Sequence, residues 1–257
     1  MLQGIDHVVI LVSDLDAATE TFTRLGFTVV PGGRHAVATH NALVAFADGA
    51  YIELIAFWED VPQHRWHRFQ ATGGGLVDYC MRTDDIAADV EALRGAGIPM
   101  SEKEPMSRLR PDGYRIEWAL SLATETRGVT PFLIEDYSPR TERVPRQTAH
   151  RNGVTGIAAL TIAAPDVTVV QSLAPLLGDT GRPIERDDIG GRGLGLVNGT
   201  HAFEFVEPAS EDGDVARYLS ARNGEGGVFE LSLHTTGSPA TFEPIEACNA
   251  RLRLIQT

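Results

Sequence analysis

Short apolar runs alternate with helix-like segments along this chain. Residues 4–12 form a nearly continuous apolar run that stops at an acidic residue, and residues 16–25 are then typical of a helix that ends at Gly26. Three further strand-like runs follow at 27–30, 41–46 and 51–57. This order predicts one β-α-β-β-β module within residues 1–60.

The same order of elements returns along the chain. A second module is predicted within residues 73–140, with a helix over 86–95 whose apolar residues share one face. A third module begins at Gly156, after a Pro- and Arg-rich linker at 138–152. A fourth begins at Gly227 and is cut short.

The copies are regularly spaced. Gly4 and Gly156 are 152 residues apart, and so are Gly75 and Gly227. A pair of modules therefore repeats as a pair. In this register, one position near the start of each module is occupied by His7, Asp78, Ala159 and Glu230.

We therefore predict an α+β chain with two tandem units. The first unit spans residues 1–144 and holds the modules at 1–60 and 73–140. The second spans residues 153–257, and we expect it to be degenerate and structural because its last module is short and Ala159 removes the histidine.

Composition narrows the classes of function. The net charge of −13, from 22 basic and 35 acidic residues, argues against binding to nucleic acid or to an anionic membrane surface. No apolar run is long enough to span a bilayer, and the first strand begins too early to leave room for a signal peptide. With two widely separated cysteines, a reduced, cytoplasmic setting is expected.

Two motifs carry a resemblance to a known family. Asp6-His7-Val8 lies near the start of the first strand, and Tyr51-Ile52-Glu53-Leu54 lies in the last strand of the first module. With residues 39–43, 107–113 and 131–134, they resemble the vicinal oxygen chelate (VOC) superfamily, and within it the glyoxalase-like domain proteins. The resemblance implies that the βαβββ modules form an open mixed β-barrel, as in glyoxalases, bleomycin-resistance proteins and extradiol dioxygenases.

The resemblance also implies a site inside the first barrel. Its metal ligands would be His7, Glu53, Asp78 and Glu135. Imidazole and carboxylate ligands suit Ni, Mn, Fe, Zn or Mg. However, Asp78 stands where a second histidine is usual, and three carboxylates repel one another without a cation. Two alternatives therefore stay open, one divalent metal or none.

Simpler structural roles compete with these assignments. His7 would also be at home as a hydrogen-bonded core residue, and Glu135 as a solvated acid at a strand end. For Glu53 a functional role is favoured over a structural one, because a carboxylate in an apolar strand costs free energy unless it is paired or lies on a cavity wall.

Further side chains are candidates for the lining of a substrate pocket. The alternative is that they belong to an exposed turn and to an exposed basic hairpin. They are His40, Asn41, Arg110 and Trp118, with Arg108 as a further candidate for contact with an anionic or aromatic ligand.

The leading functional prediction is a metal-dependent enzyme acting on a small molecule, of the lyase or isomerase type. Glu53 or Glu135 would move a proton next to a carbonyl that the metal polarises. A metal-free binding or sequestration protein of the bleomycin-resistance type is the rival, and an assembly role without a cavity is a third reading. The expected partner is a small molecule, and a homodimer would be in keeping with the family.

Overall fold

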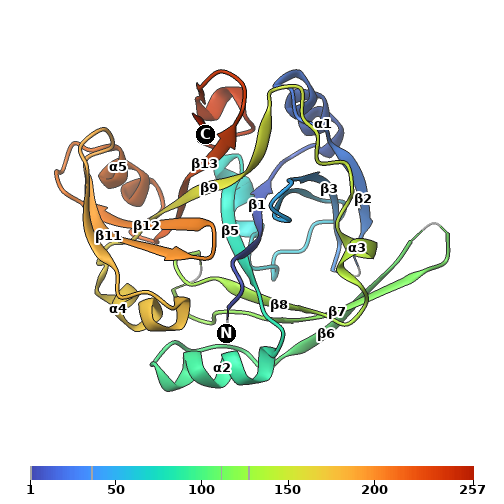
Figure 1. Cartoon of the computed structure of the whole chain (residues 1–257), viewed down its shortest axis with the longest axis horizontal. Coiled ribbons are helices and arrows are strands. Elements are labelled where there is room, and N and C mark those ends of the chain that lie inside the picture. Colours follow the sequence, from blue (N-terminus) through green and yellow to red (C-terminus); the bar gives the residue numbers. More distant parts are fainter. Residues whose placement is uncertain (1, 36, 111, 127) are drawn as a thin grey trace.

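Two mixed β-sheets organise the protein (Figure 1). The computed structural model describes residues 2–35, 37–110, 112–126 and 128–257. Within them, one sheet has eight strands in the order β2-β3-β4-β1-β5-β8-β7-β6, and the other has seven in the order β10-β11-β12-β9-β13-β15-β14. The α+β class and the tandem repetition of the modules are confirmed.

The eight-stranded sheet contains the first two modules. The first consists of β1 (Ile5–Leu11), α1 (Leu15–Arg24), β2 (Val30–Arg34), β3 (Thr39–Ala45) and β4 (Tyr51–Phe57). The second consists of β5 (Gly75–Arg82), α2 (Ile86–Gly95), β6 (Glu104–Leu109), β7 (Arg115–Ser121) and β8 (Phe132–Asp136). The modules join where β1 pairs with β5 in antiparallel fashion, and each of these strands also pairs in parallel with the last strand of its own module.

The seven-stranded sheet contains the third and fourth modules. The third consists of β9 (Val154–Ala163), α4 (Thr168–Leu173), η2 (Ala174–Leu177), β10 (Arg182–Arg186), β11 (Gly191–Asn198) and β12 (His201–Pro208). The fourth consists of β13 (Gly227–Thr235), β14 (Ala240–Phe242), η3 (Pro244–Glu246) and β15 (Leu252–Gln256). Residues 227–257 are all described and form no α-helix, so this module has fewer elements than the other three.

Short helices lie in the connections between modules. They are η1 (His67–Thr72), α3 (Arg140–Arg143) and α5 (Asp214–Ala221). The predicted linker at 138–152 therefore contains a helical turn, and the side chains of that turn reach the candidate site. Among the described residues, no helix is long and apolar enough to cross a membrane.

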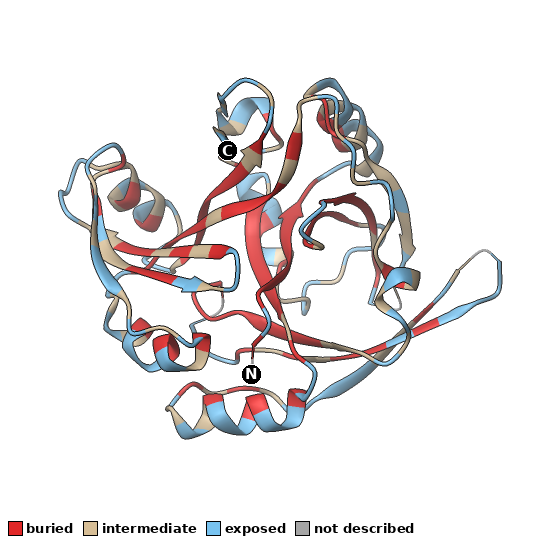
Figure 2. Cartoon of the chain, in the orientation of Figure 1, coloured by how far each residue is buried: buried red, intermediate tan, exposed pale blue. Residues whose placement is uncertain are grey.

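Each face of the first sheet has its own partner. Val8 and Ile10 of β1 belong to a core shared with the second sheet, where the rings of Tyr79 on β5 and Phe203 on β12 lie 6.1 Å apart. Val9, between them in sequence, belongs to a separate apolar cluster on the opposite face, which we call the inner face. The central strands of both sheets are largely buried (Figure 2).

Candidate active site

The inner face of the first sheet encloses a cavity of about 920 Å³. Strands from both modules and the connection at 58–66 contribute to its wall. Four aromatic side chains form much of the apolar lining, namely Tyr51, Trp66, Trp118 and Phe132. This volume lies in the range of pockets that bind small molecules.

His7 and Glu53 lie side by side on the cavity wall. The parallel pairing of β1 with β4 brings them together, and both side chains are largely buried. His7 Nε2 lies 3.6 Å from Glu53 Oε2, which is beyond hydrogen-bond distance. The His7 ring stacks on Tyr51 at 4.7 Å and meets the edge of Phe132 at 5.3 Å, so the orientation of the imidazole is fixed.

A fully buried carboxylate determines the tautomer of His7. Asp6 is the extra residue of a β-bulge opposite β5, which breaks the alternation of the strand and lets its side chain meet that of its neighbour. Asp6 Oδ1 lies 2.7 Å from His7 Nδ1. Because a carboxylate only accepts hydrogen bonds, Nδ1 carries the proton, and in the neutral imidazole the lone pair of Nε2 faces Glu53.

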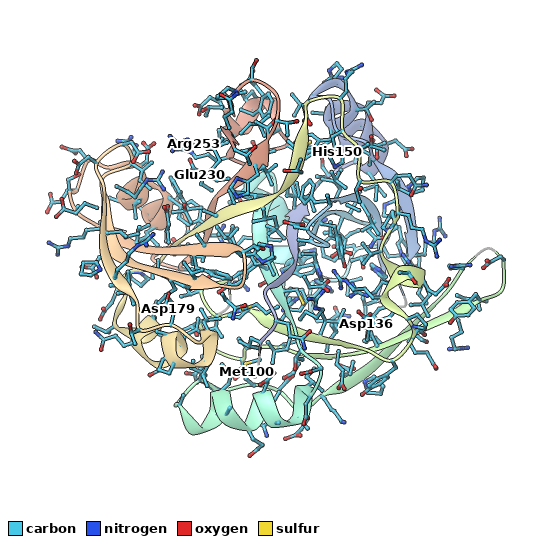
Figure 3. The ribbon with its side chains drawn as sticks, in the orientation of Figure 1. Met100, Asp136, His150, Asp179, Glu230 and Arg253 are labelled. Carbon is cyan, nitrogen blue, oxygen red and sulfur yellow. The ribbon has the colours of Figure 1, made fainter. Side chains whose placement is uncertain are left out.

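Two arginines from α3 hold Asp6 in its charged form. Arg143 donates to both carboxylate oxygens of Asp6, each at 3.0 Å, and Arg140 also pairs with it. Burial alone would raise the pKa of Asp6, but Arg143, the hydrogen bond with His7 and Arg140 hold that pKa well below its usual range. Arg143 Nε also donates at 2.6 Å to Asp136, at the end of β8 (Figure 3).

Glu53 has a neutral partner on its other side. Asn41 Nδ2 donates to Glu53 Oε1 at 2.6 Å, while Asn41 Oδ1 accepts from the backbone N–H of Gly33 at 3.0 Å. A methyl group on Gly32 would overlap the Asn41 side chain, so this close approach of β2 needs glycine. The amide therefore orients Glu53 without neutralising it.

Asp78 is not a cavity ligand. Its Oδ2 accepts from Trp66 Nε1 at 3.0 Å and lies 3.2 Å from Arg65, while its Oδ1 accepts from the backbone of Tyr79 at 2.9 Å. The Arg65 guanidinium in turn stacks on Trp66. Asp78 therefore fastens the 58–66 connection over the cavity, and its oxygens are already engaged.

By its place on the last strand of the second module, Glu135 would be the counterpart of Glu53, but strand register shows that it is not. Val9 pairs with Glu53, and the equivalent position in the second module, Cys80, pairs with Phe132. An aromatic ring therefore occupies the position equivalent to Glu53. Glu135 lies three residues further along β8 and does not line the cavity.

The four predicted ligands therefore do not converge on one point. Of them, only His7 and Glu53 line the cavity. In the part of the chain that the structure describes, no group of three or more His, Cys, Asp or Glu side chains is placed to hold a metal ion. The donor set does not fit the expected four-residue metal site, and we derive no step through a metal.

The predicted pocket residues divide in two. Asn41 and Trp118 line the cavity. His40 does not, because it alternates with Thr39 and Asn41 on β3 and so occupies the other face. Arg110 lies outside the cavity lining, where it pairs with Glu142 at 2.5 Å.

Two residues of the site, Asp6 and Arg143, were not predicted as site residues, although Asp6 belongs to the first of the two family motifs. Strand alternation places Asp6 on the face opposite His7, and only the bulge brings their side chains together. Arg143 lies in what looks like a linker, 137 residues from Asp6.

The chain matches a known protein family. The glyoxalase-like domain family matches residues 5–177, which is more than half of the chain. This chain belongs to the glyoxalase-like domain family. It therefore lies within the VOC superfamily that the two motifs indicated.

Solved structures agree on the fold. A hypothetical protein from Staphylococcus aureus matches with a TM-score of 0.73 and 15% identity over 100% of both chains. A mutant of 4-hydroxymandelate synthase from Streptomyces coelicolor matches with a TM-score of 0.62 and 16% identity, over 91% of this chain and 71% of that one. At these identities the likeness shows the fold alone.

One further structure and the search of curated proteins complete the comparisons. A xylose isomerase-like TIM barrel/4-hydroxyphenylpyruvate dioxygenase fusion protein matches with a TM-score of 0.54 and 12% identity, over 100% of this chain and 49% of that one. No curated protein sequence matches this chain.

The second sheet of this glyoxalase-like protein carries a different set of residues at the equivalent positions. Thr161 pairs with Glu204 and Ser232 pairs with Arg253, so Glu204 and Arg253 occupy the positions of Glu53 and Phe132. Arg186, the last residue of β10, is the cation that pairs with the carboxylates of this region. It pairs with Glu204, with Glu230 at 3.1 Å and with Asp188 at 2.8 Å.

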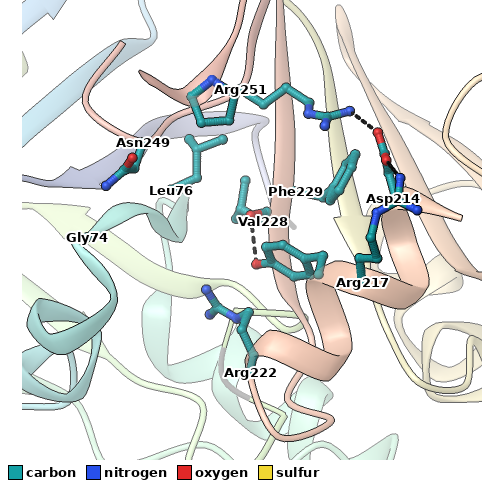
Figure 4. A pocket seen from close by; sticks show the side chains of 11 residues that line it. Gly74, Leu76, Asp214, Arg217, Arg222, Val228, Phe229, Asn249 and Arg251 are labelled. Atoms are coloured by element: carbon teal, nitrogen blue, oxygen red, sulfur yellow. Dashed lines mark hydrogen bonds and ion pairs between the residues drawn. The ribbon is translucent and has the colours of Figure 1, made fainter. Parts of the chain in front are cut away.

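A smaller cavity of about 320 Å³ lies where the two halves of the glyoxalase-like protein meet (Figure 4). Leu76 of β5 and Val228 of β13 are on its wall. The Tyr218 hydroxyl donates to the Val228 carbonyl at 2.9 Å, and burial raises the pKa of Tyr218 to about 12. This phenol therefore stays neutral and cannot serve as a base near neutral pH.

Proposed function

We propose that this glyoxalase-like protein is an enzyme that transfers a proton next to a carbonyl group of a small molecule. The observation that carries the proposal is the alignment of Asp6, His7 and Glu53, with His7 and Glu53 on the wall of the 920 Å³ cavity and Asp6 buried behind His7. Fold neighbours include an enzyme, 4-hydroxymandelate synthase, which supports the broad class and not the substrate.

Glu53 is the base in this proposal. A C–H bond of the substrate breaks, its proton goes to Glu53 Oε2, and the electron pair moves onto the adjacent carbonyl oxygen to form an enolate. Return of the proton to carbon completes an isomerisation or epimerisation without any co-reactant. The neutral amide of Asn41 holds Glu53 through Oε1, which leaves Oε2 to accept the proton.

His7 extends the path of the proton. Its Nε2 lies 3.6 Å from Glu53 Oε2, and movement of the Glu53 side chain toward the fixed imidazole would bring the two atoms within hydrogen-bond distance. The resulting imidazolium would be stabilised by Asp6, which two arginines keep ionised. A proton that moves from Glu53 to His7 returns by the same path to Glu53 and then to carbon, so both groups regain their starting states in each turnover.

A metal-free binding or sequestration protein is the second candidate. Phe132 in the position equivalent to Glu53 favours it, because an apolar ring there suits retention of a ligand more than acid–base work. In that case Glu53 and Asn41 would only anchor the ligand.

Exchange of carbon-bound protons in D₂O tests the proposed enzyme, because exchange reports proton abstraction whatever the final product. The substrates would be a panel of 2-oxo and 3-oxo compounds, followed by NMR. We expect Glu53→Gln to slow exchange by about 10²- to 10⁴-fold, which is the usual contribution of a positioned base.

Glu135→Gln is the matched control, because it makes the same change to the other carboxylate that the sequence suggested, off the cavity wall. It should leave the rate unchanged. Equal rates in wild type and Glu53→Gln for every exchanging compound would refute the enzyme. Unchanged ligand affinity in that variant would then favour the binding protein.

A further inference from the structure

Arg108 differs from the other arginines at the cavity. It lies on β6, its side chain faces the cavity, and only 9% of it is exposed. Among the described residues, no carboxylate oxygen lies within ion-pair distance of its guanidinium, and its Nε has no hydrogen-bond partner. By contrast, Arg143 pairs with Asp6, and Arg65 pairs with Asp78.

A buried guanidinium without a counter-ion is costly. Burial lowers the pKa of Arg108, but an arginine stays protonated at neutral pH, so the charge persists. Its Nη1 lies 3.5 Å from Asn41 Oδ1, which is at the limit of a hydrogen bond. The guanidinium therefore keeps unused donors directed at the cavity.

The surroundings of Arg108 keep it apart from Glu53. Asn41 lies between the two charges, with its amide nitrogen on Glu53 and its oxygen toward Arg108. A methyl group on Gly33 would lie 3.1 Å from Arg108 Cδ, so glycine leaves room for the arginine side chain. The site thus holds a cation and a base one amide apart, without letting them neutralise each other.

We infer that Arg108 binds an anionic group of the substrate, and that the substrate is a carbonyl-bearing monocarboxylate with an aromatic or apolar body. The assignment of a carbonyl compound rests on the proposed function, whereas the binding of an anion does not. A guanidinium fork matches the two oxygens of a carboxylate.

Charge and shape favour this class over a phosphate ester. A single guanidinium compensates one negative charge, and Glu53 nearby repels a second one. The lining of the cavity that Arg108 faces includes Trp118 on the neighbouring strand, together with Trp66 and Phe132. A flat hydrocarbon body would pack there while its carboxylate reaches Arg108.

Calorimetric binding to Glu53→Gln tests this inference, since that variant lacks the proposed base and does not turn over the ligand. The probes are phenylpyruvate, its methyl ester and phenyl phosphate. Phenylpyruvate should bind most tightly. Adding Arg108→Gln should weaken phenylpyruvate about ten- to a hundredfold and leave the ester almost unchanged.

Two further variants keep the test sharp. Arg108→Lys retains the charge without the fork and should recover part of the lost affinity, which shows that any loss is not caused by misfolding. Arg222→Gln is the matched control, because Arg222 lines the smaller cavity and likewise has an Nε without a partner. It should not change binding of phenylpyruvate.

Each outcome has a definite meaning. If phenylpyruvate fails to bind, or binds equally with Arg108→Gln, the inference is overturned. If phenyl phosphate binds most tightly and depends on Arg108, the monocarboxylate class is wrong. If binding follows the expected pattern while Glu53→Gln shows normal proton exchange, the anion site stands and the proposed enzyme mechanism fails.

Discussion

The inner faces of the two sheets have similar strand arrangements but differ in whether their charged side chains are paired with one another. On the first sheet, Glu53 and Arg108 face a cavity, and an amide holds them apart. On the second, Glu204 and Glu230 (Figure 3) are bridged by Arg186, a cation supplied by the chain itself. The first face therefore keeps Glu53 and Arg108 apart at the cavity, whereas the second face pairs its carboxylates with an arginine of the same chain.

The two inner faces also differ in how far side chains fill the volume next to the sheet. Helix α5 packs Val215 and Leu219 against Val206 and Phe229 on the second sheet. The corresponding connection over the first sheet, held by Asp78, leaves a cavity of about 920 Å³ beneath it. On the second sheet, therefore, the chain's own side chains pair the charges and occupy the volume that stays open beneath the connection over the first sheet.

The largest expected effect comes from breaking the charge cluster behind the first site. Arg143→Leu leaves Asp6 buried beside a single remaining arginine, so we expect the free energy of unfolding to fall by about 3–5 kcal/mol. Urea denaturation would measure it. A loss below about 1 kcal/mol would mean that Arg140 alone compensates Asp6.

Arg186→Leu is the counterpart in the second sheet. It should cost less, about 1–3 kcal/mol, because Glu204 and Asp188 are partly exposed and water can solvate them. Proton exchange at the first site should not change. Loss of exchange in a folded Arg186→Leu protein would contradict a purely structural second half.

An intermediate effect is expected from acid. The pKa of Asp6 in the folded protein lies well below its usual 3.8, so its ion pairs stabilise the fold above that pH. This stability is lost as pH falls from about 4 toward the folded-state pKa. Urea denaturation between pH 2 and 7 should show a steeper acid loss for wild type than for Asp6→Asn. Parallel curves would remove Asp6 from the acid response.

The smallest effect is expected from metals. Because the four predicted ligands do not converge, adding Ni, Mn, Fe, Zn or Mg to protein purified without a histidine tag should raise the unfolding midpoint by less than about 1 °C. Differential scanning calorimetry would measure this. A larger shift that disappears in His7→Ala would instead indicate a metal site that includes His7 and Glu53.

Much of the fold was predictable from local pattern. Runs of apolar residues, glycine stops and a regular spacing between copies identified the modules, and the helix over 86–95 was placed correctly. The family resemblance also implied that His7 and Glu53 share one site, and the parallel pairing of β1 with β4 brings their side chains to 3.6 Å. Glu135 was misaligned because spacing along the chain does not fix strand register, whereas hydrogen bonding between β5 and β8 does.

The sequence alone was enough to find the repeated modules and to place His7 near the start of the first strand. It also showed that burial of the Glu53 carboxylate costs free energy. Only the tertiary structure decided which charges meet. A bulge turns Asp6 toward His7, and a helical turn in the predicted linker brings Arg143 to Asp6. Arg108 reaches the cavity without a carboxylate partner among the residues that the structure describes. The physical reason is that local pattern sets backbone conformation, whereas compensation of buried charge depends on residues distant along the chain.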